Sequence, residues 1–341
     1  MDVLITGAGG RIGSQAARLL LAGGHRVRGL DVARGPVVDE LETLGARVFV
    51  GGLNDRQLLA EACAEVDAVV HTGAVLSSHG RPDDLLIDAN IVGTYTLLTA
   101  VRDHAPALRR FVNLSSDAVY WTGGDVAPAA LPVDEHFPRT AGSVYGATKV
   151  AAEQLCWSFL HTYGVPIVIA RPTATAAPAE LITPGSVFGR RWFTGGALDW
   201  WASRPSLAPA DEELRRLLRD SGAAPDDLFV AIDAEGRSSV SMTNDARDVA
   251  AGICLMLEVP EAVGEAFNLG STEHSDAELV RYLGERLGRR VHQIVHPGKR
   301  PSWYVSSLKA RSLLGYRPRH DVFSMVDEAL AAAATGTEVS A

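Results

Sequence analysis

Two side chains with acid–base chemistry lie four residues apart, at Tyr145 and Lys149. Their segment, residues 143–163, has the pattern of a helix, and residues four apart on a helix share a face. A phenol with a pKa of about 10 is a poor base at neutral pH. A neighbouring ammonium favours the phenolate and lowers that pKa. We therefore expect Tyr145 to exchange a proton with a substrate hydroxyl, although the same spacing also occurs by chance on solvated helices.

Three glycines at intervals of three follow the first predicted strand, residues 2–6. The first permits a sharp turn, the second lets a pyrophosphate approach the backbone, and the third lets the next helix, residues 14–22, pack closely. The free N–H groups at the start of that helix would face the phosphates. A glycine-rich turn without a ligand is the alternative. The cofactor contacts expected here are Gly7, Gly10, Arg11, Ile12 and Gly13.

The second predicted strand, residues 25–30, ends in Asp31. A carboxylate at this place can accept both hydroxyls of an adenosine ribose. It would repel a 2′-phosphate, so NAD is favoured over NADP, although the nearby Arg34 weakens this preference.

Two further strand ends carry small or polar residues. The strand at 67–71 is followed by Thr72, Gly73 and Ala74, whose small size would keep the backbone close to a dinucleotide, unless this is an ordinary strand-ending turn. The strand beginning at Phe111 ends at Ser115, Ser116 and Asp117. Parallel α/β sheets bind ligands at the carboxyl ends of their strands, so both ends are expected at one site.

These features together resemble the extended (atypical) short-chain dehydrogenases, also called NAD-dependent epimerase/dehydratases. The glycine spacing, the segment S-S-D-A-V-Y-W at 115–121, the Y-x-x-x-K pair and residues 309–318 carry the resemblance. It covers nearly the whole chain and is poorest at 173–238. It implies an α/β fold: a Rossmann-type doubly wound parallel sheet, formed by 1–172 and about 239–262, with a smaller C-terminal α/β substrate-binding lobe, formed by about 173–238 and 263–334. Residues 335–341 would be a tail.

The resemblance also implies roles for individual residues. Ser116 would be catalytic and hydrogen-bond the substrate oxygen, Tyr145 would be the acid/base, and Lys149 would also hold the nicotinamide ribose. Asn90 would brace the strand that carries Ser116, unless it is an ordinary solvated amide. The further cofactor contacts expected are Leu53, Thr72, Gly73, Ala74, Asn90, Tyr145, Lys149 and Pro172. The substrate contacts expected are Ser116, Asp117 and Tyr145.

Departures from the family pattern bear on the reaction. Ala118 stands where dehydratases carry a glutamate, which disfavours dehydration. Ala174 and His296 replace two residues that touch the diphosphate of nucleotide sugars. Basic pairs at 190–191 and 299–300 could still bind an anion. The leading hypothesis is an NAD-dependent oxidoreductase acting on a secondary alcohol or ketone of a small polar molecule such as a sugar, sugar acid, polyol or natural-product intermediate. A nucleotide-sugar epimerase with retained NAD is the alternative, and a non-enzymatic NAD-binding protein is a third.

Composition and charge limit the classes of molecule that the protein is expected to bind. Net charge is −9 from 32 basic and 41 acidic residues, which argues against a nucleic-acid surface. No run of about 20 apolar residues is apparent to span a membrane, and no signal peptide is recognisable. The three scattered cysteines fit no metal or disulfide spacing and indicate a cytoplasmic protein without a metal site. Apolar surface on the helices after Asp84 and Tyr145 predicts a homodimer.

Overall fold

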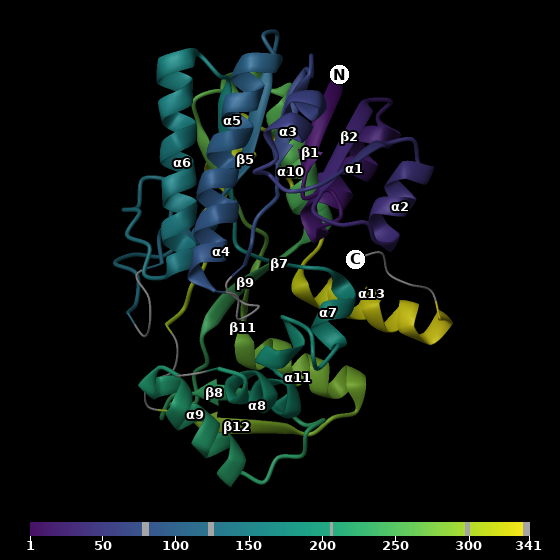
Figure 1. The fold of residues 1–341 in the computed structure, drawn as a ribbon. Helices are drawn as coiled ribbons and strands as arrows, with labels where there is room; N and C mark the ends of the chain where they lie inside the picture. Colours follow the sequence, from purple (N-terminus) through teal and green to yellow (C-terminus); the bar gives the residue numbers. More distant parts are fainter. Residues whose placement is uncertain (77–81, 122–125, 205–206, 297–300, 337–341) are drawn as a thin grey trace.

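The computed structural model describes residues 1–76, 82–121, 126–204, 207–296 and 301–336 (Figure 1). Within these ranges, seven parallel strands form the main sheet, in the order β10-β6-β5-β4-β1-β2-β3. Their bounds are β1 (Asp2–Thr6), β2 (Arg26–Asp31), β3 (Arg47–Val50), β4 (Ala68–His71), β5 (Arg110–Leu114), β6 (Ile167–Pro172) and β10 (Ala266–Leu269). The chain order reverses beside β1, so the fold is a doubly wound Rossmann-type α/β sheet, as predicted.

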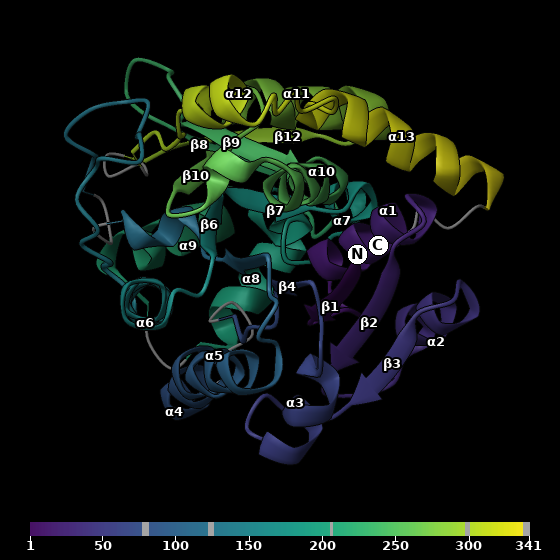
Figure 2. The same cartoon turned by 90° about the horizontal axis from the view of Figure 1, so that it is seen from above.

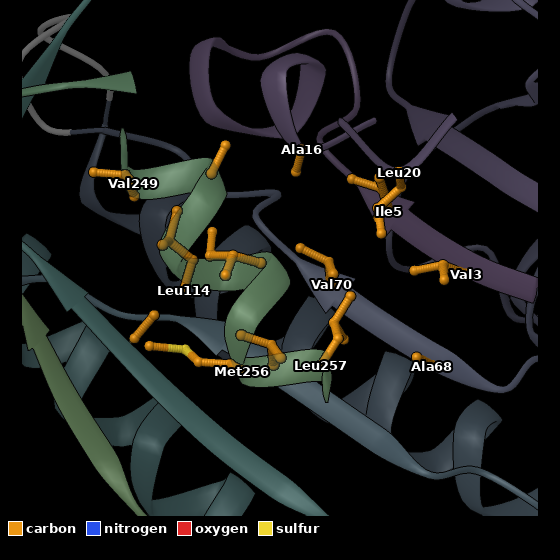
Figure 3. Close-up of a cluster of buried hydrophobic side chains, with 14 of the residues drawn as sticks. Val3, Ile5, Ala16, Leu20, Ala68, Val70, Leu114, Val249, Met256 and Leu257 are labelled. Carbon is orange, nitrogen blue, oxygen red and sulfur yellow. The ribbon is translucent and has the colours of Figure 1, made fainter. Parts of the chain in front are cut away.

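Helices cover both faces of this sheet. The helices that contribute are α1 (Arg11–Ala22), α2 (Pro36–Thr43), α3 (Arg56–Cys63), α4 (Asp83–Ile87), α5 (Gly93–His104), α6 (Val144–Tyr163) and α10 (Ala246–Glu258). Successive strand residues point to opposite faces. Val3 and Ile5 therefore pack with α1 and α10, as Figure 3 shows, whereas Leu4 packs with α3, α5 and α6. Burial on both faces explains why these strands are almost continuously apolar.

A smaller lobe lies beyond the strand ends. Figure 1 shows α8, α9 and α11 on the other side of β7, β9 and β11 from the main sheet. In Figure 2, α11, α12 and α13 lie along the side opposite α4 and α5. The strands of the lobe are β7 (Ala174–Ala176), β8 (Leu228–Ile232), β9 (Val240–Asp245), β11 (Glu273–Ser275) and β12 (Val291–Val295). Its helices are α7 (Pro178–Ile182), α8 (Thr194–Ala202), α9 (Pro209–Asp220), α11 (Asp276–Leu287), α12 (Leu308–Leu313) and α13 (Val322–Thr335).

Three expectations are corrected by these elements. Strand β10 pairs with β6 along Ala266–Leu269, so this strand belongs to the main sheet and not to the lobe, where the sequence placed residues 263–334. Strand β9, within the range 239–262 that the sequence placed in the main-sheet domain, pairs instead with β7 and β11. The rest of the two-part division stays a prediction. The helical run 84–104 is interrupted by a π-helix, η2 (Asp88–Val92), between α4 and α5.

The most apolar 18-residue window of the same helical run, Asp83–His104, has a mean hydropathy of 1.2, so the run could cross a membrane by length and composition alone. No such run was expected from the sequence. Half of its most apolar window is buried inside the protein, where Leu97, Leu98 and Val101 contribute to the core against the sheet. We therefore interpret it as a core helix.

The glycine turn after β1 joins the two strands on which the site is built. Gly7 has a φ of +68°, and a Cβ on it would lie 2.8 Å from Gly73 Cα, after β4. A Cβ on Gly13 would overlap the Gly7 carbonyl oxygen and lie 2.7 Å from Thr72 Oγ1. The start of α1 thus packs directly on both turns, and only glycine allows this approach.

We expect Gly13→Ala to lower the free energy of unfolding by about 1–3 kcal/mol, because the added methyl group must displace backbone. Gly185→Ala is the matched control, since nothing lies within 4 Å of the Cβ it would add, and its effect should stay within about 0.5 kcal/mol. Urea denaturation followed by circular dichroism measures both. Equal stability of the two variants would contradict the packing described here.

Candidate active site

Asp31, at the end of β2, is hydrogen-bonded to the glycine turn. Its Oδ2 accepts a hydrogen bond from Gly9 N at 2.8 Å and its Oδ1 accepts one from Val32 N at 2.7 Å. The carboxylate therefore lies beside the glycine turn, as predicted. Arg34, in contrast, donates to Asp39 and Glu42 on α2. Its charge is thus compensated within the protein.

Arg11 and Ile12 lie at the start of α1. The Arg11 guanidinium is bound at both ends by Glu180 of α7, with Nε to Oε2 at 2.6 Å. The side chain predicted to contact a cofactor also links the glycine turn to α7. Ile12 packs against the hydrophobic core on the α1 side of the sheet.

The remaining predicted cofactor residues lie around the same strand ends. Leu53 packs on the core and against the start of α5, where a Cβ on Gly93 would come within 2.9 Å of it. Thr72 Oγ1 donates to Thr6 O at 2.7 Å and so fixes the turn that continues through Gly73 and Ala74. Pro172 ends β6.

Asn90 braces a different segment from the one predicted. Its Oδ1 accepts from Val75 N at 2.8 Å, and its Nδ2 donates to Val75 O and to Thr148 Oγ1, both at 3.0 Å. It therefore ties the segment after β4 to α6, and not the strand that carries Ser116. The side chain is 2% exposed and is hydrogen-bonded to these partners, so it positions the segment after β4 against α6. Asn90 lies in the π-helix η2, and short π-helical segments are frequent at functional sites.

Ser116, Tyr145 and Lys149 are brought together by β5 and α6. Ser143 caps α6 by accepting from Gly146 N at 3.0 Å, which places Tyr145 in the first turn. Tyr145 is close enough to Ser116 for the serine hydroxyl to lower the pKa of the phenol. The Lys149 Nζ donates to Leu114 O at 2.9 Å and lies 5.8 Å from the centre of the Tyr145 ring. The three predicted side chains thus meet at the carboxyl end of β5.

In the protein without a cofactor, the pKa of Tyr145 is raised above its ordinary value, so Lys149 alone does not lower it as predicted. Burial is the largest cause, the Asp117 carboxylate adds to it, and the nearby Ser116 hydroxyl acts the other way. Lys149 does not reverse this balance. Burial also lowers the pKa of Lys149 to about 8, while Glu153 raises it. Both groups of the pair are therefore held closer to neutrality than in water.

Asp117 lies directly beside Ser116. Ser116 Oγ donates to Asp117 Oδ1 at 3.1 Å, and Trp303 Nε1 donates to Asp117 Oδ2 at 2.8 Å. Burial raises the pKa of Asp117, while Trp303, Ser116 and the charge of Arg191 lower it. Trp303 was not anticipated, because a tryptophan in an irregular segment signals packing more often than a site.

A buried polar network behind α6 was also missed. Glu153 Oε1 and Oε2 accept from Arg171 Nε and Nη2 at 2.8 and 2.7 Å. Arg171 Nη1 donates to the Tyr120 hydroxyl at 2.6 Å, which in turn donates to Asn268 of β10. The network ties α6 to β6, to the exit of β5 and to β10. Glu153 lies one turn beyond Lys149 on α6. This spacing places the two side chains on one helix face and could have indicated that Glu153 is buried near the site.

The positions considered for anion binding are dispersed. His296 Nε2 contacts Ala210 O at 3.0 Å, and Ala174 begins β7. Arg190 lies over the Trp200 ring and Arg191 over the Phe188 ring. Residues 299–300 lie outside the described residues. Among the described residues, no group of three His, Cys, Asp or Glu side chains could hold a metal ion.

The lowered pKa of Lys149 predicts a pH-dependent stability difference. Between about pH 8 and the ordinary lysine value of 10.5, the folded protein has released this proton and the unfolded chain still holds it. Stability rises with pH wherever the unfolded state binds more protons. The free energy of unfolding of the wild type should therefore rise, relative to Lys149→Met, across this window, as urea denaturation at several pH values would measure. Parallel pH profiles of the two proteins would contradict the assignment.

Comparison with known proteins identifies the family to which the chain is similar. Residues 3–189 match the model of the NAD dependent epimerase/dehydratase family. The chain is 29% identical to the 4-hydroxy-2-methyl-3-oxo-4-farnesyl-3,4-dihydroquinoline-1-oxide ketoreductase of Stigmatella aurantiaca, over 94% of this chain and 92% of that protein. It is also 29% identical to the UDP-glucose 4-epimerase of Corynebacterium glutamicum, over 97% and 95% of the two chains.

Solved structures of two other proteins have a fold similar to that of this chain. A short-chain dehydrogenase/reductase superfamily protein of Agrobacterium tumefaciens with bound NAD has a TM-score of 0.86 and 29% identity, over 98% of both chains. The UDP-glucuronic acid 4-epimerase of Bacillus cereus, in complex with NAD, has a TM-score of 0.75 over 99% of both chains, but its 22% identity supports the fold alone. The chain therefore belongs to the NAD-dependent epimerase/dehydratase family and is an enzyme of the short-chain dehydrogenase type.

Proposed function

We propose that this enzyme is an NAD-dependent oxidoreductase that interconverts a secondary alcohol and a ketone on a small polar substrate. The observation that carries the proposal is the meeting of Ser116, Tyr145 and Lys149 at one strand end, next to a glycine turn that has no room for side chains. A sugar, sugar acid, polyol or natural-product intermediate is the expected class of substrate.

The residues present fit a dinucleotide. Side chains at Gly7 and Gly13 would collide with neighbouring backbone, so the turn keeps the start of α1 open to a pyrophosphate. Asp31 would hold the adenosine ribose and disfavour the 2′-phosphate of NADP, and Arg34 is already paired with two acids. The NAD bound in the 29%-identical Agrobacterium tumefaciens structure supports the same cofactor. When bound, NAD supplies the hydride acceptor and, in reduced form, the hydride donor.

The side chains of the chain itself divide the remaining work. Tyr145 takes the hydroxyl proton of an alcohol, or returns it to a ketone oxygen. Ser116 holds the same oxygen by a hydrogen bond and steadies its developing charge. Lys149 supplies positive charge one helical turn away and holds the nicotinamide ribose. Asn90, through Thr148, and the Glu153–Arg171 pair hold α6 in place.

A nucleotide-sugar epimerase with retained NAD is the second candidate. The similarity to the Corynebacterium glutamicum UDP-glucose 4-epimerase over almost the whole chain favours it. Against it, Ala174 and His296 stand where diphosphate contacts are expected, and His296 is bonded to Ala210 O. The non-enzymatic interpretation is set aside because the family is one of enzymes.

We also propose that the enzyme is a cytoplasmic homodimer. Ile87, Val92 and Tyr95 on the helical run 83–104, and Val144 and Tyr163 on α6, are 42–52% exposed. Apolar side chains exposed together on two neighbouring helices suit a helix–helix contact between two copies. Sedimentation of the purified protein tests this assembly.

Replacing Tyr145 by Phe tests the proposed role of its hydroxyl. The rate should fall by about 100-fold or more, because a positioned general acid–base is lost, whereas the affinity for NAD should change little. Tyr163→Phe is the control, since Tyr163 is on the same helix but 52% exposed. Steady-state rates and NADH fluorescence titrations measure the two effects. A Tyr145→Phe enzyme with wild-type turnover would refute the mechanism.

The two candidate reactions differ in what leaves the enzyme. An oxidoreductase incubated with NAD⁺ and a panel of sugars and polyols should release NADH, seen as its absorbance. An epimerase should release none and should instead interconvert UDP-glucose and UDP-galactose, which chromatography of the sugars resolves. UDP-sugar interconversion without NADH release would replace the first proposal by the second.

A further inference from the structure

A segment of the lobe crosses the carboxyl edge of the main sheet. It leaves β6 at Pro172, continues through β7 and reaches α7, where Glu180 is bonded to Arg11 beside the turn after β1; Figure 2 shows α7 beside α1. Strands β5 and β4 lie between β6 and β1, so the segment spans roughly 14 Å of this edge at about 4.8 Å per strand. Ligands of parallel sheets bind at that edge. We call residues 172–180 the strap.

The backbone of the strap is held by the lobe. Strand β7 pairs with β9, with Ala174–Ala176 in register with Thr243–Asp245. Leu181, which follows the strap on α7, is 1% exposed and belongs to the hydrophobic core of the lobe. Side chains at the end of the strap can therefore move more easily than its backbone.

Glu180 holds Arg11 in a fixed orientation at that end. Arg11 Nε donates to Glu180 Oε2 at 2.6 Å, and Arg11 Nη2 donates to Oε1. Glu180 Oε2 also accepts from Ala177 N at 2.9 Å, and the Arg11 guanidinium lies 5.8 Å from the centre of the Phe188 ring. The two charged side chains are 25% and 21% exposed. A bidentate pair of this kind is stronger and more directional than a single hydrogen bond.

Arg11 is also placed to meet the cofactor. It is the first residue of α1, whose free N–H groups are expected to bind the pyrophosphate. A guanidinium has five N–H donors, and Glu180 uses two of them. The remaining donors can bind a phosphate oxygen, so one positive charge can lie between two anions that would otherwise repel each other.

We propose that Arg11 and Glu180 form a side-chain gate at the pyrophosphate end of the cofactor site, with Glu180 as a positioning residue that acts through Arg11. The closed pair joins the strap to the glycine turn and keeps the dinucleotide between the strap and the strand ends. Opening of the pair lets the dinucleotide enter or leave. Glu180 therefore controls the rate of cofactor exchange more than the affinity. This inference rests on the proposed function, because it takes NAD as the ligand of the glycine turn.

The test measures how fast NADH leaves the enzyme. Glu180→Gln keeps an oxygen for Ala177 N but removes the charge of the gate. After NADH-loaded enzyme is mixed with excess NAD⁺, the decay of NADH fluorescence should be about 3- to 10-fold faster in this variant than in the wild type, as expected for a weakened, largely buried ion pair. Association should accelerate similarly, so the Kd for NADH should stay within about 3-fold.

Glu40→Gln is the matched control. Arg18, two helical turns further along α1, donates to Glu40 through the same two nitrogens, Nε and Nη2, but away from the glycine turn. This control should keep the wild-type rates of NADH exchange. Arg11→Lys is a second variant of the gate: it keeps the charge but loses the bidentate geometry, so it should also release NADH faster.

Salt provides a readout that a merely structural role would not change. Screening weakens ion pairs, so raising the salt concentration from about 0.05 M to about 0.5 M should accelerate NADH release more in the wild type than in Glu180→Gln. Failure of the wild type to bind NADH would contradict the proposed function itself. Normal binding, with NADH release from Glu180→Gln and Arg11→Lys no faster than from Glu40→Gln, would overturn the gate, as would equal salt responses of the wild type and Glu180→Gln.

Discussion

The chemistry of the site depends on opposing influences on the proton of the Tyr145 phenol. Burial and the Asp117 carboxylate hold the proton on Tyr145, and the nearby Ser116 hydroxyl favours its release. Lys149 lies one helical turn away, but burial lowers its own pKa to about 8. The Tyr145 phenol therefore stays protonated at neutral pH in the protein alone. Positive charge brought close to the phenol by a bound cofactor would tip this balance, which couples proton transfer to cofactor binding.

The rest of the fold keeps these groups in register. Asn90, in the π-helix η2, ties the segment after β4 to Thr148, which precedes Lys149 on α6. The Glu153–Arg171 pair ties the same helix to β6 from the other side. Buried ion pairs stabilise little in net terms, but they fix geometry when every donor is satisfied. Helix α6 is thus held at both faces, so Tyr145 and Lys149 meet Ser116 without a ligand to align them.

The sequence predicts the main sheet well because strong local signals agree there. Apolar runs, the glycine turn and the Y-x-x-x-K spacing each indicate one structure, and Ser116, Tyr145 and Lys149 lie at one strand end as expected. The lobe is predicted poorly: β8 and β12 lie in irregular-looking stretches and pair with each other only in the folded chain. Partners distant in sequence are the common reason for the misses. Trp303 reaches Asp117, Glu180 reaches Arg11, and Asn90 reaches Val75, none of which a spacing rule could show.

Titration of Tyr145 tests the central claim most directly. The ultraviolet difference spectrum of tyrosinate, recorded against pH for the wild type and for Tyr145→Phe, isolates the ionisation of this one residue. We predict that it ionises only at strongly alkaline pH in the protein alone and at clearly lower pH with saturating NAD⁺, while NADH, which lacks the positive ring, produces a smaller shift. The same titration midpoint with and without NAD⁺ would contradict the account.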